Sequence, residues 1–276
     1  MTAVVLPLRS LLFVPATRLE RIEKAINTGA DAVVVDWEDA VADADKVQAR
    51  AATIAYLATQ PAIKVWVRVN AAHSAYHADD VLACQHCEGI VGVLLPKAER
   101  MADVEAVAKK TNKPIIALIE SPRGLINLPQ IAQAQGLSRL SFGALDLAHA
   151  LGVTPDTPGG DFIMHQIRYQ LLLHTQVNDL AAPIDTVYPD FNDEAGLSHR
   201  VELWQQMGFA GMLCIHPRQI ASVHAHLQPD PALLAWASAV VIAADERGQV
   251  AFQLDGEMID APVIARARRL LAQANQ

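Results

Sequence analysis

The chain has 276 residues, of which 52% are hydrophobic and 19% charged, and its formal net charge is −8. This composition suits a well-buried core and excludes general disorder, and the negative charge argues against nucleic acid or an anionic membrane surface as a partner. The three cysteines provide no disulfide framework, which indicates a reducing compartment, the cytoplasm. We find no apolar stretch of the length of a membrane span, so no spanning helix is expected.

Apolar runs of strand length recur along the chain. Between them, helical patterns are clearest over residues 17–27, 43–59, 101–110 and 192–207, and glycines follow three helical segments where C-caps are expected. The intervals between the ends of successive runs are 23, 30, 29, 23, 26, 42 and 28 residues. Eight units of this size predict a (β/α)₈ barrel. The runs end near Pro15, Glu38, Arg68, Lys97, Glu120, Asp146, Tyr188 and His216.

A doubly wound sheet is the alternative fold, but no Gly-x-Gly-x-x-Gly follows any predicted strand. The barrel is therefore favoured. Its longest interval contains a segment rich in Pro, Asp and Gly over residues 152–160, which predicts an inserted loop.

A further 60 residues follow the last predicted strand. Residues 231–246 have a helical pattern, residues 248–260 predict a hairpin or loop, and residues 261–274 predict a basic amphipathic helix. No linker suggests an independent domain. We expect a barrel over residues 1–228 and an extension over residues 229–276 that packs on its own barrel or on a neighbouring subunit.

In a barrel, the C-terminal ends of the strands face one mouth, where active sites form. The polar residues at the predicted strand ends are therefore candidates as a set, although each alone could be a surface residue or a helix cap. They are Arg18, Glu38, Asp39, Arg68, Asn70, Lys97, Glu120, Asp146, Asp190 and His216.

Glu120 and Asp146 each end an apolar run and precede a Gly or Pro breaker. A buried strand that ends in a carboxylate must provide that group with a partner or a metal. Two such strands, one βα unit apart, predict an open Mg²⁺ site with room for water and a substrate oxygen. Alternatively, each acid caps the following helix, where the helix dipole favours a negative charge.

Arg68 lies in Lys-Val-Trp-Val-Arg-Val-Asn, beside the predicted metal site, where a guanidinium suits bidentate binding of a substrate carboxylate. The alternative is a salt bridge to Glu38 or Asp36. Glu38 and Asp39 either hold metal-bound water and orient Arg68, or cap the helix after them. Lys97 is a candidate contact for a phosphate or a carboxylate.

Other motifs give weak signals. Cys84-Gln-His-Cys87 is a lone Cys-x-x-Cys without a second pair, so neither zinc binding nor redox activity is expected. No Gly-x-Ser-x-Gly motif is present, which argues against a serine hydrolase.

The order of motifs along nearly the whole chain resembles the citrate lyase β-subunit-like branch of the HpcH/HpaI aldolase family. The motifs that carry the resemblance include Val-Val-Val-Asp-Trp-Glu-Asp-Ala-Val, Val-Arg-Val-Asn, Leu-Pro-Lys-Ala-Glu, Ile-Glu-Ser-Pro and Gly-Ala-Leu-Asp-Leu-Ala. They also include residues 9–16, 208–219 and 255–262. Their joint occurrence is specific.

The resemblance implies a Mg²⁺-dependent carbon–carbon lyase or synthase that interconverts a β-hydroxyacyl-CoA thioester with an acyl-CoA and a small 2-oxo acid. It implies metal ligation by Glu120 and Asp146, which also bind substrate, and oxo-acid binding by Arg68. Arg9 is expected among the substrate-binding residues. Asp260 matches an acid/base aspartate presented to a neighbouring subunit, which implies a homo-oligomer, a trimer or hexamer.

Two features depart from the family pattern near the expected thioester end of the site, namely Trp37 and the pair Ala16-Thr17. Two other functions remain open. One is a CoA-independent aldolase acting on pyruvate or oxaloacetate, and the other is a non-catalytic member that kept the fold. The sequence leaves open which thioester is used, whether CoA or an acyl-carrier protein carries it, and whether lyase, synthase or thioesterase activity dominates.

Overall fold

The structure is a computed structural model that describes residues 8–227, 231–248 and 251–274. It divides into two compact units, one over Leu8–His226 and a second that begins at Leu227. The boundary therefore lies close to the end of the predicted barrel.

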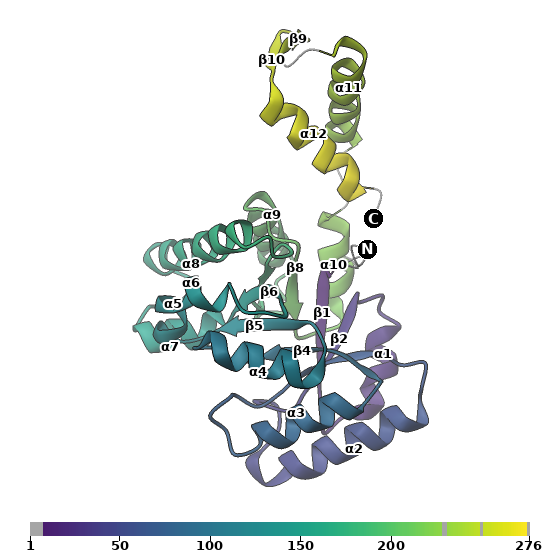
Figure 1. Cartoon of the computed structure of the whole chain (residues 1–276), viewed down its shortest axis with the longest axis vertical. Coiled ribbons are helices and arrows are strands. Elements are labelled where there is room, and N and C mark those ends of the chain that lie inside the picture. Colours follow the sequence, from purple (N-terminus) through teal and green to yellow (C-terminus); the bar gives the residue numbers. More distant parts are fainter. Residues whose placement is uncertain (1–7, 228–230, 249–250, 275–276) are drawn as a thin grey trace. The chain divides into compact units, whose positions relative to one another are not determined.

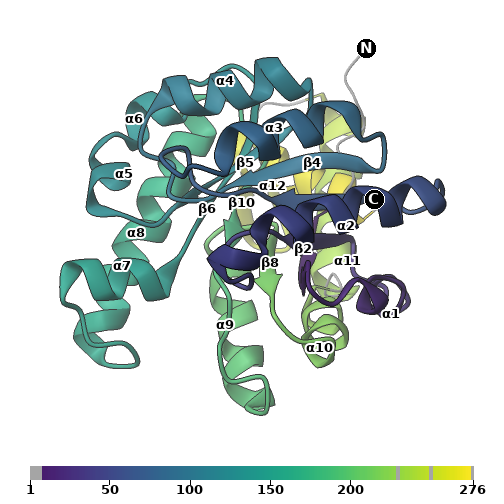
Figure 2. The ribbon, with the colours of Figure 1, turned by 90° about the horizontal axis from the view of Figure 1, so that it is seen from below.

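The first unit is a (β/α)₈ barrel, as predicted (Figures 1 and 2). Its strands form one parallel sheet in the order β6-β5-β4-β3-β2-β1-β8-β7. They are β1 (Ser10–Pro15), β2 (Ala32–Asp36), β3 (Val65–Arg68), β4 (Ile90–Leu95), β5 (Ile115–Ile119), β6 (Leu137–Phe142), β7 (Ile184–Asp185) and β8 (Gly211–Cys214).

The two edge strands of this sheet, β6 and β7, close the barrel through side chains and loops. The amide of Ala181 donates to the carbonyl of Ser138 (3.1 Å), and Arg139 Nη1 donates to the carbonyl of Ala182 (2.5 Å). Near the mouth, the amide of Ala144 donates to Thr186 Oγ1 (3.1 Å). The last contact ties the segment after β6 to the segment after β7.

Helices surround the sheet, and α2, α3 and α4 lie side by side on its outer face (Figure 2). The predicted helices are confirmed, and the longest interval holds two helices, α7 and the 20-residue α8, with a shorter loop than expected. The helices of this unit are η1 (Leu19–Arg21), α1 (Ile22–Ile26), η2 (Asp43–Asp45), α2 (Lys46–Thr59), α3 (His77–His86), α4 (Met101–Thr111), α5 (Pro122–Ile126), α6 (Leu128–Ile131), α7 (Ala144–Leu151), α8 (Pro158–Val177), α9 (Glu194–Gln206) and α10 (Arg218–His226).

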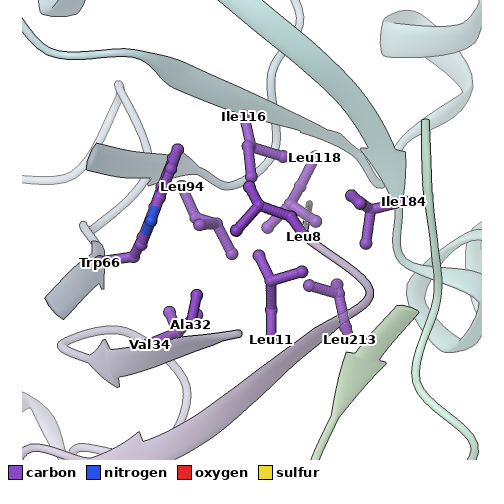
Figure 3. Close-up of a cluster of buried hydrophobic side chains, with 10 residues drawn as sticks. All are labelled: Leu8, Leu11, Ala32, Val34, Trp66, Leu94, Ile116, Leu118, Ile184 and Leu213. Carbon is purple, nitrogen blue, oxygen red and sulfur yellow. The ribbon is translucent and has the colours of Figure 1, made fainter. Parts of the chain in front are cut away.

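A buried apolar cluster fills the barrel interior (Figure 3). Trp66 is its largest member, and a Cβ at Gly92 on the neighbouring strand would lie 2.4 Å from the indole, so only glycine fits there. Cluster members on one strand are two residues apart, as expected when alternate side chains face the same side. The cluster comprises Leu8, Leu11, Ala32, Val34, Trp66, Leu94, Ile116, Leu118, Ile184 and Leu213.

Arg9 lies at the N-terminal end of β1, away from the strand ends that form the mouth. Its backbone N–H, Nε and Nη2 all donate to the carboxylate of Asp31, which precedes β2, at 2.7, 2.9 and 2.8 Å. This position corrects the expectation that Arg9 binds substrate. Its bidentate ion pair instead joins the starts of two strands.

Trp37 is fully buried, and its Nε1 donates to Thr53 Oγ1 on α2 (3.1 Å). The indole packs between the sheet and that helix. Trp37 is therefore a core residue that directly follows the mouth end of β2.

The second unit has a hydrophobic core of its own, which corrects the expectation that the extension is not an independent unit. The core contains Ala237, Val240, Ala243, Ala244, Phe252, Ile259 and Ala267. The elements are α11 (Pro231–Arg247), the antiparallel pair β9 (Phe252–Leu254) and β10 (Glu257–Ile259), and α12 (Ala261–Ala274). Helix, hairpin and basic helix follow in the predicted order.

In the part of the chain that the structure describes, one segment, Arg218–Glu246, is long and apolar enough by composition to cross a membrane. It comprises two elements, α10 and α11, that belong to different units. In the barrel, α10 packs on α9, and in the second unit α11 packs on α12. Both helices therefore have protein partners.

Candidate active site

A cavity of about 400 Å³ lies at the C-terminal ends of the barrel strands, where the mouth was predicted. Its position follows from the alternation that builds the core. Residues two positions beyond members of the buried cluster share their face and extend it toward the mouth. Six cavity-lining residues are related to the cluster in this way, namely Phe13, Asp36, Arg68, Glu120, Thr186 and Ile215.

Arg68, the last residue of β3, is fixed by Asp36, its partner on the neighbouring strand. Nε donates to Asp36 Oδ1 (2.8 Å) and Nη2 to Oδ2 (2.6 Å), and the guanidinium lies 5.0 Å from the centroid of the Phe13 ring. Burial opposes the charge, but the bonds to Asp36 outweigh it, so the pKa of Arg68 is raised further. One edge of the guanidinium is therefore held rigidly.

The rest of the guanidinium faces two more carboxylates. Nη1 lies 3.0 Å from Asp39 Oδ2 and 3.2 Å from Glu38 Oε2. The salt bridges considered as an alternative for Arg68 are therefore present. The Asp39 side chain is 55% exposed and lines the cavity. Because Asp39 is exposed, its side chain can move off Nη1 when a substrate carboxylate binds there, and no buried group has to move.

The turn after β2 orients these acids. The Asp36 carboxylate accepts the backbone N–H groups of Glu38 (2.9 Å) and Ala40 (3.1 Å). Such a side-chain cap satisfies amides that no strand neighbour binds. It leaves Glu38 buried and Asp39 exposed.

Glu38 lies between the two cations of the site. One carboxylate oxygen accepts a bond from Lys97 Nζ, and the other faces Arg68 Nη1. Burial raises the pKa of Glu38 despite both cations. Glu38 does not line the cavity wall. It can affect a bound ligand only through Arg68 and Lys97, which it holds.

Lys97 connects Glu38 to Glu120. Its backbone has a left-handed conformation with a φ of 50°, which is unusual for a side chain of this size. In this conformation its N–H donates to Glu120 Oε2 (2.9 Å). Burial opposes its charge, but the bond to Glu38 raises the pKa of the ammonium. Lys97 thus stays charged and holds two carboxylates.

Glu120 follows β5 and lines the cavity while almost fully buried. Burial, with repulsion from Glu38 second, raises its pKa to about 7. Gly143 makes room for it, since a Cβ there would lie 2.8 Å from both Glu120 Cγ and Oε1. A buried carboxylate with so high a pKa is a group that a bound cation would stabilise.

Asp146 lines the same cavity but does not end a strand, which corrects that part of the sequence interpretation. Strand β6 ends at Phe142, and Asp146 lies in the first turn of α7, where it is exposed. The alternative position, at a helix N-terminus, is thus observed. It still places the carboxylate on the cavity wall with Glu120.

The cavity's donor set fits Mg²⁺. Four carboxylates, those of Asp36, Asp39, Glu120 and Asp146, line the cavity together with the Arg68 guanidinium. Within the described residues, no group of three or more His, Cys, Asp or Glu side chains is arranged to enclose a metal. Mg²⁺ suits such a site, because it is commonly bound by one or two carboxylates and keeps several waters.

Three of the residues predicted at the mouth, Asn70, His216 and Arg18, have their side chains outside the cavity. Asn70 is buried and donates to Asp80 Oδ2 (2.7 Å), so it supports the fold. The ring of His216 stacks on Phe191 with centroids 4.4 Å apart. Arg18 pairs with Glu20 at the surface (2.6 Å). None of these side chains lines the cavity.

Sequence reasoning missed part of the site. Asp36 entered it only as an ion-pair partner, although its place two residues after Val34 is a signal that alternation supplies. Thr186 and the apolar side chains of Leu145 and Ile215 were not singled out. Leu145 and Ile215 are 52% and 41% exposed. The charged cavity thus has an apolar rim.

In the second unit, Asp260 caps α12. Its Oδ1 accepts the backbone N–H of Val263 (3.3 Å), and its carbonyl accepts that of Ile264 (2.9 Å). The capping position considered from the sequence is therefore observed. A cap uses one carboxylate oxygen and leaves the other for a second role.

Comparisons with known proteins agree on one family. The model of the HpcH/HpaI aldolase/citrate lyase family matches residues 9–217. The citrate lyase subunit beta-like protein of Deinococcus radiodurans is 36% identical over 279 residues, covering 96% of each chain. The (3S)-malyl-CoA thioesterase of Cereibacter sphaeroides is 34% identical over 277 residues, covering 97% of this chain and 95% of that protein.

A solved structure is similar over the same extent. The crystal structure of the protein CitE from Mycobacterium tuberculosis, in complex with magnesium, acetoacetate and coenzyme A, matches with a TM-score of 0.83 at 33% identity. The match covers 97% of this chain and 98% of that one, so it includes both units.

Proposed function

Because the chain belongs to the HpcH/HpaI aldolase/citrate lyase family, we propose that it is a Mg²⁺-dependent carbon–carbon lyase. It interconverts a β-hydroxyacyl-CoA thioester with an acyl-CoA and a small 2-oxo acid. One observation carries the proposal. Arg68, Glu120 and Asp146 line a single cavity at the mouth of the barrel, which joins a carboxylate-binding group to a pair of metal-binding groups.

Arg68 binds the carboxylate of the oxo acid. Asp36 holds the Nε edge of the guanidinium, so the Nη1 side, now facing Asp39 and Glu38, is the side offered to substrate. A charge-assisted contact from a fixed guanidinium orients the adjacent carbonyl carbon, and orientation lowers the barrier to carbon–carbon bond chemistry.

Glu120 and Asp146 would hold the cation, with Lys97 fixing Glu120 through its backbone N–H. A bound Mg²⁺ supplies Lewis-acid polarisation of the oxo-acid carbonyl. In the cleavage direction a base takes the proton of the substrate hydroxyl, the carbonyl of the oxo acid forms as the carbon–carbon bond breaks, and the α-carbon of the departing thioester gains a proton. Asp260 of a neighbouring subunit is the group proposed to handle that last proton.

The proposal includes a homo-oligomer, a trimer or hexamer, because Asp260 belongs to a compact unit separate from the barrel. A closed ring lets each extension serve a neighbour's cavity. The proposed location is the cytoplasm, since all three cysteines are free thiols.

The apolar rim favours a thioester over a free hydroxy-oxo acid. Leu145 and Ile215 expose large apolar surfaces beside a cavity that concentrates charge. A substrate with a charged head and a long, partly apolar arm matches this arrangement, whereas a small free acid gains nothing from the rim.

A substrate panel tests the function. Malyl-, citramalyl- and citryl-CoA are incubated with Mg²⁺ and the wild-type protein, and the products are identified by mass spectrometry. We expect an acyl-CoA and a 2-oxo acid from at least one thioester, and no turnover in EDTA. Free CoA and an intact hydroxy acid would indicate a thioesterase. Activity on free hydroxy-oxo acids alone would indicate the CoA-independent aldolase, and no turnover of any substrate a non-catalytic member.

A further inference from the structure

Lys46, the first residue of α2, is a buried cation that the proposed reaction does not use. It is 7% exposed, and no ion pair to a carboxylate is found for it in the described residues. Its ammonium donates to the carbonyl of Glu38 (2.8 Å) and that of Trp37 (3.3 Å), and it lies 5.9 Å from the centroid of the Tyr76 ring. A buried ammonium without a direct counter-ion is costly, so its position calls for a compensating role.

Both carbonyls belong to the turn that carries the acids of the site. The Trp37 carbonyl also accepts a bond from Asn70 Nδ2 (3.1 Å), and Asn70 is itself held by Asp80. Lys46 and Asn70 therefore hold the backbone of this turn from two different elements.

We propose that Lys46 is a positioning residue of the active site. By holding the carbonyls of Trp37 and Glu38, it keeps the Glu38 carboxylate between Lys97 and Arg68. The inference rests on the proposed function and deepens it. It states that Lys46, which does not line the cavity, positions the residues that bind the oxo acid.

The contacts determine which binding step Lys46 affects. Glu38 touches Arg68, which would hold the oxo-acid carboxylate, and Lys97, which holds Glu120. Neither partner belongs to the apolar rim. Loss of Lys46 should therefore weaken binding of the oxo acid and leave binding of the thioester unchanged.

The test compares Lys46→Met, which keeps the apolar stem without the charge, with Lys46→Arg and a control, Lys64→Met. Lys64 also donates to a carbonyl, that of Glu88 (3.1 Å), but it is exposed and precedes β3 at the opposite end of the strand. Pyruvate binding in the presence of Mg²⁺ is measured by calorimetry. The KM values for oxo acid and thioester are measured in the synthesis direction, and folding is followed by circular dichroism.

We expect Lys46→Met to weaken pyruvate binding and to raise the oxo-acid KM by about 10–100-fold, the usual effect of losing a group that supports a ligand-binding residue. The thioester KM should not change. Lys46→Arg should recover part of the loss, because a guanidinium can donate to both carbonyls. Lys64→Met should match the wild type. If Lys46→Met does not fold, Lys46→Gln, neutral with one remaining donor pair, serves in its place.

A double variant separates positioning from general support of the fold. In a Glu38→Gln background, Lys46→Met should add little further loss of pyruvate affinity, because both changes act through the same side chain. Full additivity would overturn the inference, as would a neutral variant at Lys46 that lowers only the Tm. If the wild type binds pyruvate but turns over no thioester, the proposed function fails while the calorimetric comparison still decides the role of Lys46.

Discussion

At the residue scale, the charged groups of the cavity depend on one another for position. Asp36 fixes Arg68, Glu38 lies between Arg68 and Lys97, and the backbone of Lys97 fixes Glu120. Such networks are sensitive to shape as well as to charge, because a partner that keeps its charge but loses its geometry leaves a buried group unsatisfied.

Arg68→Lys tests the need for a planar guanidinium. Lysine keeps the charge but cannot bond both oxygens of Asp36 while facing a substrate carboxylate. We expect kcat/KM to fall by an amount equivalent to about 2–4 kcal/mol of transition-state binding. The matched control is Arg100→Lys, since Arg100 also pairs bidentately with an acid, Asp103, but at the exposed surface of α4. Wild-type kinetics in Arg68→Lys would contradict the assignment.

Glu120→Gln tests how much the buried charge of Glu120 destabilises the folded protein. Between the usual pKa of 4.5 and the raised value of about 7, the folded protein binds more protons than the unfolded chain. The contribution of Glu120 to stability therefore falls as the pH rises through this window. In EDTA, the glutamine variant should match the wild type near pH 4.5 and exceed its free energy of unfolding by on the order of 2–3 kcal/mol at pH 8.

Denaturant titrations at the two pH values measure this difference, and added Mg²⁺ should reduce it by stabilising only the wild type. A difference between the two proteins that does not vary with pH would show that burial of the charge is not its cause.

At the element scale, the site depends on how closely the segment after β6 approaches the end of β5. Gly143 begins the turn into α7 and lies against Glu120, while Ala144 bonds to Thr186 after β7. The distance between Glu120 and Asp146, the two acids proposed to hold the metal, therefore depends on how the turn at Gly143 packs against the end of β5.

Gly143→Ala should displace Glu120, because the new Cβ would lie 2.8 Å from its side chain. We expect the Mg²⁺ affinity measured by calorimetry to fall at least tenfold, the usual scale for disturbing a ligand's support. The control is Gly159→Ala in α8, where a Cβ meets nothing within 4 Å. Equal Mg²⁺ affinity in both variants would show that the carboxylate tolerates the added methyl group.

At the scale of the whole molecule, the barrel and the second unit are separate compact bodies with their own cores. The proposed reaction needs a group from each, so assembly of subunits becomes part of catalysis.

Complementation tests this requirement. Asp260→Ala and Glu120→Ala should each be inactive, and mixed oligomers should regain activity because some sites combine an intact Glu120 with an intact Asp260. Asp245→Ala, which removes another acid of the second unit and its pair with Arg268, should remain active alone. Background activity in mixed oligomers shown to form would exclude action across an interface.

The sequence by itself determined the barrel, the mouth and most of the charged groups there. Apolar runs of strand length, spaced by one βα unit, leave a chain few ways to bury both faces of its strands. Strand-end acids such as Glu120 were visible because a carboxylate directly after a buried run has few structural explanations. The helix–hairpin–helix order of the extension followed from local periodicity alone.

The tertiary structure decided what depends on contacts between distant segments. It placed Arg9 at the opposite end of the barrel and Trp37 in the core, because a motif's position in sequence does not reveal which way its side chains point. It showed Asp146 on a helix, since packing set where β6 ended. Only the folded chain brings the ammonium of Lys46 to the carbonyls beneath the site, because no local pattern marks a buried lysine.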